Sequence, residues 1–433
     1  MKRTVDRYLV NWRNSNNRKV LLVRGARQVG KTYSIRQLGK TFDYFLEVNF
    51  DKDSAIHSFF QESLDPSGIC EKLSAYYDIP IINGKTLLFF DEIQACLPAI
   101  QALRFFYEKM PGLHLIAAGS LLEFALEQIP TFGVGRITSL FMYPMSFFEF
   151  LEATRGTGIV TLLKNSDFQK PLDDALHLKA LDSFRTYLII GGLPEIVEAY
   201  RQRSNIRECH ELLDDLIETF RDDFAKYKTK SPVIRLEETF RSIVTQAGGK
   251  FIFSHISSHG PITAYQDALE LLVNAGLAYK IYHTSARGIP LGAQINIKKF
   301  KVILFDLGIH QRLSGLDIAD LLVEDYASLI NRGALAEIFV GCELIAGSSP
   351  NSRPQLFYWH REARSSNAEV DYVIQRNKEI IPIEVKAGLK GSMKSMRMFL
   401  KERNQSKGIR ISQEPTGIIN GVSIIPIYLS GEI

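Results

Sequence analysis

Short apolar runs alternate with amphipathic stretches over about the first 150 residues. The apolar runs predict strands at Val20–Arg24, Tyr44–Asn49, Thr86–Phe90, Leu113–Ala118 and Ile137–Met142. The stretches between them predict helices such as Thr32–Leu38 and Ala99–Lys109. Strands that alternate with helices are typical of a parallel sheet covered by helices. We therefore expect an α/β domain over residues 1–150.

The pattern becomes helical from about Ser146 to about residue 230. The periodicity predicts helices that include Phe147–Ala153, Ala175–Tyr187 and Asn205–Tyr227. Within this region the sequence Gly-Gly-Leu-Pro-Glu at 191–195 ends one helix and begins another, because proline is tolerated in a first helical turn. Residues 151–230 are therefore expected to form a helical domain.

Two further segments follow. Residues 231–325 begin with the helix-start signal Ser231-Pro232. They then predict helix 234–247, the stretch Phe251–Ile256, helix Thr263–Ala275 and two strand-like runs, Ala278–Thr284 and Val302–Asp306. Helices followed by a β-hairpin describe a winged-helix module. Residues 326–433 predict a separate small α/β domain with helix 331–346, strands Gln355–His360, Glu369–Gln375 and Glu379–Lys386, and a helix near 392–402.

A phosphate-binding loop follows the first predicted strand. The pattern G-x-x-x-x-G-K-T is formed by Gly25, Ala26, Arg27, Gln28, Val29, Gly30, Lys31 and Thr32, and Tyr33 continues into the next helix. Backbone N–H groups of such a loop and of the helix N-terminus point at phosphates. Lys31 can reach the β- and γ-phosphates, and the Thr32 hydroxyl can ligate Mg²⁺. We expect residues 25–33 to bind ATP together with Mg²⁺.

Polar residues at the ends of later strands complement this loop. Asp91 and Glu92 follow a hydrophobic strand, so Asp91 can hold Mg²⁺ and Glu92 can polarise the attacking water. In isolation the same pair would be read as a solvated helix cap. Ser120, at the end of the next strand, is either a γ-phosphate sensor or the N-cap of a helix that begins at Leu121. Arg136 is either an arginine finger or a member of a surface ion pair.

These residues resemble the AAA-type P-loop ATPases of bacteria and archaea. The matching segments are GARQVGKT, LLFFDEIQ, AAGSLL, VGRI followed by YPMSFFEFL, and YLIIGGLPEIV, within residues 18–200. The resemblance implies a five-stranded AAA+ core and a helical lid that carries the Gly-Gly-Leu-Pro turn. It identifies Lys31, Glu92, Ser120 and Arg136 as catalytic candidates. A small-molecule kinase is disfavoured, because no acceptor-binding signature is visible and the appended modules suit a switch.

Acidic residues and a lysine gather in the last domain. Glu369 and Asp371 share one side of a predicted strand, and Glu384 and Lys386 share one face of another. With Glu337 on the preceding helix, Asp371 and Glu384 could bind Mg²⁺, and Lys386 could position water. The arrangement resembles the PD-(D/E)xK nuclease superfamily, which implies a restriction-endonuclease-like fold. The alternative is an acidic strand tip with Lys386 as its salt-bridge partner.

The middle module gives an ambiguous signal for DNA. Lys298, Lys299 and Lys301 cluster in the expected wing, where they could contact a phosphate backbone. The helix near Thr263–Ala275, however, contains no arginine or lysine. A winged helix that contacts only protein is therefore an alternative. The histidines at 255, 259 and 283 show no metal-ligand spacing, and we interpret them as structural or surface residues.

Composition adds few constraints. The chain of 433 residues has a net charge of +4, which does not by itself indicate a nucleic-acid partner. Its four cysteines lack C-x-x-C spacing and predict neither a zinc site nor a disulfide framework. There is no apolar stretch of about 18 residues and no signal-type core, so we expect a cytoplasmic protein without membrane contact. Three functions remain open: an ATP-driven enzyme acting on DNA, a nucleotide switch that binds protein, and an ATP-gated nuclease. A homo-oligomer is compatible with each.

Overall fold

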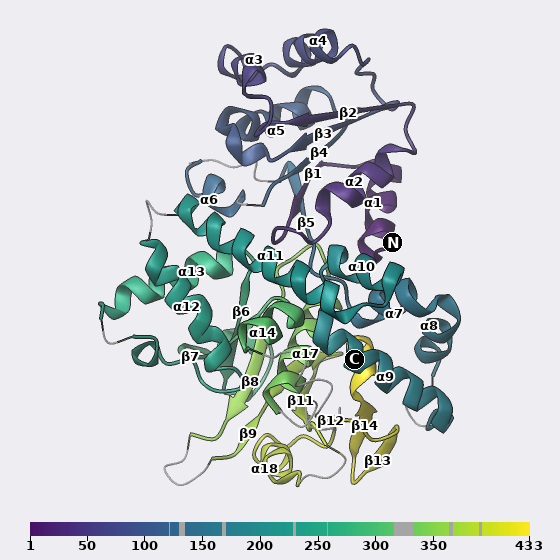
Figure 1. Cartoon of the computed structure of the whole chain (residues 1–433), viewed down its shortest axis with the longest axis vertical. Helices are drawn as coiled ribbons and strands as arrows, with labels where there is room; N and C mark the ends of the chain where they lie inside the picture. Colours follow the sequence, from purple (N-terminus) through teal and green to yellow (C-terminus); the bar gives the residue numbers. More distant parts are fainter. Residues whose placement is uncertain are drawn as a thin grey trace. The chain divides into compact units, whose positions relative to one another are not determined.

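The computed structural model describes residues 1–120, 122–129, 135–166, 170–227, 231–257, 259–315, 333–362, 367–388 and 392–433. The chain divides into two compact units, which we describe separately (Figure 1). Unit 1 consists of Met1–Tyr143 and Ser349–Arg353, and unit 2 consists of Pro144–Ser348 and Pro354–Ile433. The expected boundary at 325/326 and the expected helix starts at 121 and 331 lie outside the described residues. The expected division into four domains stays a prediction.

Unit 1 is built on a five-stranded parallel sheet. Its strands are β1 (Val20–Arg24), β2 (Tyr44–Asn49), β3 (Thr86–Asp91), β4 (His114–Ala118) and β5 (Ile137–Phe141). Their order is β2-β3-β4-β1-β5, and every neighbouring pair is parallel. All residues of β3 and β4 are buried, which suits strands whose two faces are covered. The predicted α/β class and the five predicted strands are confirmed, each to within one residue at either end.

The helices of unit 1 precede the first strand or lie between later ones. They are α1 (Thr4–Asn14), α2 (Lys31–Gly39), α3 (Ser58–Gln61), α4 (Pro66–Tyr77), α5 (Leu97–Lys109) and α6 (Leu122–Leu126). Helix α2 begins directly at the end of the glycine-rich loop, so its N-terminus faces the edge of the sheet where β1 ends. The carboxyl ends of β3 and β4 reach the same edge, because β4 pairs in parallel with β1 and β3 pairs in parallel with β4.

A short segment from late in the chain completes unit 1. The N–H of Phe141, the last residue of β5, donates a hydrogen bond to the carbonyl oxygen of Pro350 at 2.7 Å. The Arg353 guanidinium forms an ion pair with Glu123 on α6 at 3.0 Å. We call Ser349–Arg353 the strap. The chain enters and leaves unit 2 on either side of it.

The helices of unit 2 largely match the predicted ones. They are α7 (Phe147–Arg155), α8 (Thr157–Lys164), α9 (Asp174–Ile190), α10 (Pro194–Arg203), α11 (Ile206–Phe224), α12 (Val233–Thr245), α13 (Ile262–Asn274), α14 (Leu307–Leu313), α17 (Gly333–Ala346) and α18 (Lys394–Glu402). The Gly191-Gly192 turn between α9 and α10 is held by Asp306, whose carboxylate accepts the Gly192 N–H at 2.7 Å and the Ile309 N–H at 3.1 Å. Burial raises the pKa of Asp306 to about 6. The turn is therefore fixed from the start of α14.

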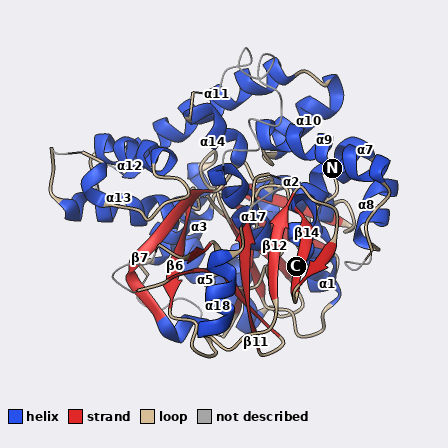
Figure 2. Cartoon of the chain, turned by 90° about the horizontal axis from the view of Figure 1, so that it is seen from below, coloured by secondary structure: helices blue, strands red, loops and turns tan. Residues whose placement is uncertain are grey.

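Unit 2 contains two sheets. One has the order β7-β6-β8-β9 and the other β10-β11-β12-β14-β13. The strands are β6 (Ala278–Thr284), β7 (Ile295–Leu304), β8 (Leu356–His360), β9 (Glu369–Val370), β10 (Tyr372–Arg376), β11 (Glu379–Val385), β12 (Gly408–Ser412), β13 (Gly417–Ile419) and β14 (Val422–Pro426). Figure 2 shows α12 and α13 beside β6 and β7.

Two features of these sheets differ from the sequence-based expectation. The expected wing strands pair as the antiparallel hairpin of β6 and β7, but β6 also pairs in parallel with β8 from the last part of the chain. An edge strand with unpaired backbone groups readily accepts such a partner, and a local pattern does not reveal it. The single strand expected at Glu369–Gln375 is divided at Asp371 into β9 and β10, which belong to different sheets.

The described helices include none that is both long and apolar enough to cross a bilayer.

Candidate functional site

The glycine-rich loop adopts the backbone conformation that a phosphate cradle needs. Gly25 has φ 144°, and a side chain there would collide with the carbonyl oxygen of Met142. Gly30 has φ 92° and caps α2 in the left-handed region, where glycine is favoured. Gln28 also lies in this region, with φ 66°. Because these angles turn the chain sharply, the backbone reverses direction between β1 and α2 at the end of the sheet.

Lys31 lies at the centre of this loop. Its ammonium group donates to the carbonyl oxygens of Gly25 at 2.9 Å and Ala26 at 2.7 Å. The side chain is 8% exposed. Burial lowers the pKa of Lys31 to about 8, although the carboxylates of Glu92 and Asp91 oppose this shift. Among the described residues Lys31 forms no ion pair, so its charge remains available to phosphate oxygens.

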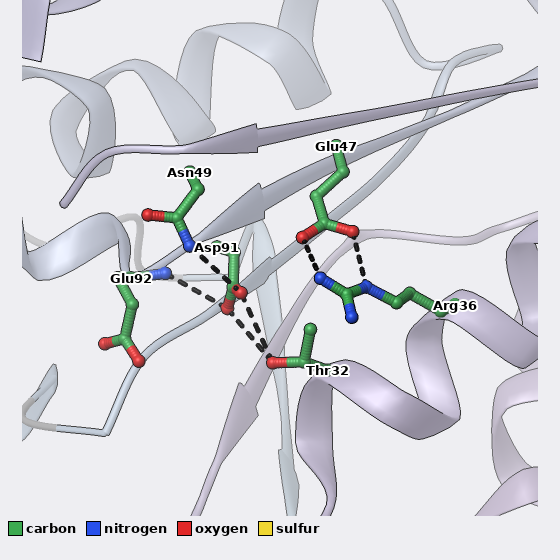
Figure 3. Close-up of polar contacts among 6 residues, drawn as sticks. All are labelled: Thr32, Arg36, Glu47, Asn49, Asp91 and Glu92. Carbon is green, nitrogen blue, oxygen red and sulfur yellow. Dashed lines mark hydrogen bonds and ion pairs between the residues drawn. The ribbon is translucent and has the colours of Figure 1, made fainter. Parts of the chain in front are cut away.

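Thr32 and Asp91 face each other across the sheet edge, as Figure 3 shows. The Thr32 hydroxyl lies 3.3 and 3.4 Å from the two oxygens of the Asp91 carboxylate. Asn49 on β2 donates to the same carboxylate at 3.4 Å, and the Glu92 N–H donates at 3.1 Å. A hydroxyl and a carboxylate oxygen are ligands that suit Mg²⁺. The donor set therefore fits the metal expected with ATP, and Asn49 is a neighbour that the sequence did not indicate.

Burial is the largest cause that raises the pKa of Asp91 above its ordinary value. The carboxylates of Glu92 and Glu47 add to the shift. Glu47 is itself neutralised by Arg36, whose guanidinium forms two contacts of 2.7 Å with the Glu47 carboxylate (Figure 3). A cation bound at Asp91 would relieve this accumulation of negative charge.

Glu92 is held in a defined orientation. Its backbone lies in the left-handed region, with φ 47°, a conformation that is costly for a residue with a side chain and that clusters at functional sites. Its carboxylate accepts a hydrogen bond from the Gln94 amide at 2.5 Å and from the Ser120 hydroxyl at 3.3 Å. The side chain of Gln94 fills the space beside Gly119, where a Cβ would collide with it. Ser120 therefore contacts Glu92 at the carboxyl end of β4, and Gln94 is a second neighbour of Glu92.

Two residues next to the loop, Arg3 and Tyr33, form further hydrogen bonds. Arg3, which the sequence did not single out, donates to the carbonyl oxygens of Val29 at 2.8 Å and Tyr143 at 2.7 Å. It therefore fixes the loop from the start of α1. Tyr33 is exposed, and its hydroxyl accepts a hydrogen bond from the amino terminus at 3.2 Å.

Arg136 lies away from the phosphate loop. It precedes β5, and Ile137 pairs with Val20 at the beginning of β1, so Arg136 lies at the opposite edge of the sheet from the loop. Its guanidinium forms an ion pair with Glu108. Within one chain, Arg136 is therefore a member of a surface ion pair, which is the second of the two roles expected from the sequence.

Unit 2 contains a second group of acidic residues around a lysine, which we call the carboxylate cluster: Lys301, Glu337, Glu369 and Asp371. Lys301 on β7 is 3% exposed, and its ammonium group lies 3.1 Å from Glu337 on α17 and 2.6 Å from Glu369 on β9. The adjacent carboxylates raise the pKa of Lys301 although burial opposes them. The cluster thus contains its own cation.

Asp371 is a partly buried member of this cluster. Burial is the main cause that raises its pKa, followed by the charge of Glu337. Its carboxylate accepts the Val385 N–H at 2.7 Å. Lys386 acts electrostatically on both Asp371 and Glu337, and it forms an ion pair with Glu384 at 2.8 Å. The structure therefore brings the sequence-predicted residues Glu337, Asp371, Glu384 and Lys386 into one region, and it adds Lys301, which the sequence placed in a wing.

The expected basic wing is wrong for Lys301, because that side chain is buried among carboxylates and cannot contact a nucleic-acid backbone. Lys299 pairs with Glu362 at 2.6 Å. Lys298 is exposed, and the part of the chain that the structure describes offers it no ion pair. The wing surface is accordingly far less cationic than its sequence suggested.

Three segments match known protein families. Residues 17–151 match a family model described as an AAA domain. Residues 181–320 and 332–429 match two models, each described as a domain of unknown function (DUF8612 and DUF4143). Residues 17–151 are therefore similar to AAA domains, which supports nucleotide binding and hydrolysis. The nuclease-like and winged-helix assignments are not confirmed.

Solved structures give distant similarities. The Walker-type ATPase of Pyrococcus abyssi matches at 15% identity and a TM-score of 0.46, over 71% of this chain and 94% of that chain. The Orc1 protein of Aeropyrum pernix in complex with DNA matches at 13% identity and a TM-score of 0.27, over 74% and 92% of the two chains. No curated protein matches the sequence.

Proposed function

We propose that this protein is a Mg²⁺-dependent ATPase that transmits its nucleotide state to unit 2. The observation that carries this proposal is the opposition of Thr32 and Asp91 beside the buried ammonium group of Lys31. The three side chains surround the space that the loop and the start of α2 enclose. A triphosphate in that space would meet backbone N–H groups, one lysine charge and a pair of metal ligands.

The residues around the loop divide the chemistry between them. Thr32 and Asp91 would hold Mg²⁺, which neutralises charge on the phosphate oxygens. Lys31 would bind the β- and γ-phosphates. Glu92 would orient the attacking water, and Ser120 and Gln94 would keep its carboxylate in place. Arg136 could stabilise the γ-phosphate only from a second copy of the chain, because it lies at the other edge of its own sheet.

The strap supports coupling to unit 2. The chain passes between the units at residues 143/144, 348/349 and 353/354. Within unit 1, Arg353 of the strap pairs with Glu123, and Glu123 also binds the guanidinium of Arg24. Arg24 directly precedes Gly25 of the phosphate loop. A rearrangement of the loop on hydrolysis would therefore act through Arg24 and Glu123 on a segment that is covalently joined to α17 and β8.

A protein target fits unit 2 better than DNA does. Two of the three wing lysines are paired with carboxylates, and one of these two is buried. Helix α13 carries no arginine or lysine. Phosphate contacts supply most of the affinity of non-specific DNA binding, and these elements offer few. We therefore favour a nucleotide switch that binds protein.

Metal-dependent DNA cleavage is the less favoured alternative. It requires carboxylates that are available to a metal ion. In the carboxylate cluster Lys301 already neutralises Glu337 and Glu369.

Substitution of Glu92 tests the proposal. Glu92→Gln should reduce ATP turnover by at least about 100-fold, since a positioned general base contributes roughly 10²–10⁴-fold. Binding of Mg-ATP should persist, because the phosphate and metal ligands remain. Turnover is measured by phosphate release, and binding is measured with a fluorescent ATP analogue. The matched control is Glu71→Gln on α4, an exposed carboxylate in the same unit.

Unchanged turnover in Glu92→Gln would remove this residue from the reaction. Failure of the wild-type protein to bind Mg-ATP would refute the proposal as a whole. A several-fold stimulation of turnover by DNA would contradict the preference for a protein target.

A further inference from the structure

Three potential metal ligands lie together in unit 2, outside both groups described above. His283 lies on β6, His360 ends β8, and Glu362 follows two residues later. One ligand atom from each residue lies within 4.8 Å of the other two. The strand register explains this arrangement. His283 pairs with Tyr358 in the parallel ladder, and His360 shares the face of Tyr358 because side chains alternate along a strand.

Both histidines are buried, and in each ring only one of the two nitrogens has a hydrogen-bond partner within the described part of the chain. His283 is 3% exposed and His360 is 9% exposed. Among the described residues, Nδ1 of His283 and Nε2 of His360 have no hydrogen-bond partner. A buried polar atom without a partner costs roughly 1–3 kcal/mol. The two rings that carry these atoms are neighbours, with centroids 4.3 Å apart, so one bound ligand could satisfy both nitrogens.

The other nitrogen of each ring faces a backbone carbonyl. Nε2 of His283 lies 3.3 Å from the carbonyl oxygen of His360, and Nδ1 of His360 lies 3.2 Å from that of Arg361. A carbonyl can only accept, so these nitrogens carry the protons and the unpartnered nitrogens present lone pairs. Metal-binding histidines commonly donate their second N–H to a carbonyl in this way. Burial also lowers the pKa of both imidazoles, which favours the neutral form that binds metals.

We propose that His283, His360 and Glu362 bind a divalent transition-metal ion of the Zn²⁺ class through the two unpartnered ring nitrogens and one carboxylate oxygen. Two imidazoles and one carboxylate form the donor set of open zinc sites, in which water takes the fourth position. Zinc–ligand bonds of about 2.0–2.2 Å place tetrahedral ligands roughly 3.4 Å apart. One ligand atom of each residue lies within 4.8 Å of the other two, so side-chain movements are needed to reach that spacing. The ion would join the ends of β6 and β8.

Lysines oppose this ion. Lys299 on β7 pairs with Glu362 at 2.6 Å, and the charge of Lys250 also acts on His360. Metal binding must therefore draw the Glu362 carboxylate away from Lys299. This competition gives the proposal a specific consequence: removal of the Lys299 charge should strengthen metal binding.

The test is metal titration of the full-length protein after chelator treatment and without nucleotide. Co²⁺ absorption reports the coordination, and calorimetry with Zn²⁺ gives stoichiometry and affinity. We expect one ion per chain. Loss of an outer-shell partner costs about 10–100-fold in affinity, so loss of a ligand in His360→Gln should cost at least about 100-fold. Lys299→Ala should tighten binding several-fold. The exposed residue His255 provides the control His255→Gln, which should bind like the wild type.

Glu362→Gln gives a second measurement at a surface position that does not threaten folding, and it should also weaken binding. Circular dichroism verifies that each variant is folded. A wild-type protein that binds no stoichiometric Zn²⁺ overturns the proposal. The same conclusion follows if His360→Gln and Glu362→Gln retain the wild-type Co²⁺ spectrum and affinity.

Discussion

Two buried lysines in this protein lie beside acidic residues but are held in opposite ways. Lys31 in unit 1 donates to two carbonyl oxygens of its own loop, and burial lowers its pKa to about 8. Lys301 in unit 2 contacts the carboxylates of Glu337 and Glu369, which raise its pKa. Carbonyl oxygens carry only partial negative charge, so Lys31 can still bind an anionic ligand. The carboxylates of Glu337 and Glu369 carry a full negative charge each, so they neutralise Lys301.

The acidic residues of the two units differ in the same way, because Asp91 has neutral contacts whereas Glu337 and Glu369 contact a lysine. Asp91 contacts neutral donors, namely Thr32, Asn49 and a backbone N–H, and therefore keeps a negative charge that a metal ion could neutralise. Residue types alone do not separate a ligand site from an internal ion cluster. What separates them is whether the protein itself supplies the opposite charge.

The largest effect is expected from Lys301→Met, which removes the internal cation and keeps most of the apolar stem. Breaking a buried ion pair from one side typically costs about 3–5 kcal/mol, because it leaves buried charge uncompensated. We expect a loss of this order in the stability of unit 2. Urea unfolding in a Trp12→Phe background measures it, since the chain has two tryptophans and Trp359 alone then reports on unit 2. Lys298→Met, at an exposed position of the same strand, is the control.

The same unfolding measurement, repeated with a divalent metal ion, tests whether another cation can replace Lys301. Millimolar Mn²⁺ should restore part of the stability of Lys301→Met, because a cation can replace the ammonium group among the carboxylates. It should have little effect on the wild type. Equal stability of Lys301→Met and the wild type would contradict the view of Lys301 as the internal cation of the cluster.

A smaller effect, of roughly 10-fold, is expected from pH on ATP binding. With a pKa of about 8, Lys31 is mostly charged at pH 7 and mostly neutral at pH 9. Affinity for an anionic nucleotide should therefore be nearly constant below pH 7 and should fall as pH rises through 8. Titration of a fluorescent ATP analogue from pH 6.5 to 9.5 measures the change. Lys31→Arg, which stays charged, should show a flat profile over this range, and a flat wild-type profile would refute the assignment.

The contrast also explains what the sequence could predict. Lys31, Thr32 and Asp91 were predictable because each follows a strongly apolar strand, and parallel strands in one domain bring their ends together. The five strands of unit 1 were predictable for the same reason. Each strand is visible in a short stretch of sequence. The rule that parallel strands end at the same edge of a sheet then predicts that these residues lie together.

The features that the sequence did not predict depend on contacts between segments that lie far apart along the chain. The pairing of β6 with β8 joins residues about 75 positions apart, and no periodicity indicates it. That pairing brings His360 to His283, and the neighbouring β7 carries Lys301 to Glu337. Arg3 and Gln94 were missed because their roles come from single hydrogen bonds to the loop and to Glu92. The motif LLFFDEIQ contains Gln94, but its position two residues after Glu92 gives no reason to expect its amide on that carboxylate.

The smallest effect is expected from Gln94→Ala, which removes the 2.5 Å hydrogen bond to Glu92. Ser120 would still hold the carboxylate, so ATP turnover should fall only about 3- to 10-fold, equivalent to roughly 1 kcal/mol. If Gln94 acts by positioning Glu92, the loss should disappear in a Glu92→Gln background, because residues that act as a unit are not additive. A merely structural role would instead lower turnover by the same factor in both backgrounds. Phosphate release from the two single variants, the double variant and the wild type distinguishes these outcomes, and KM should stay unchanged if Gln94 does not contact the nucleotide.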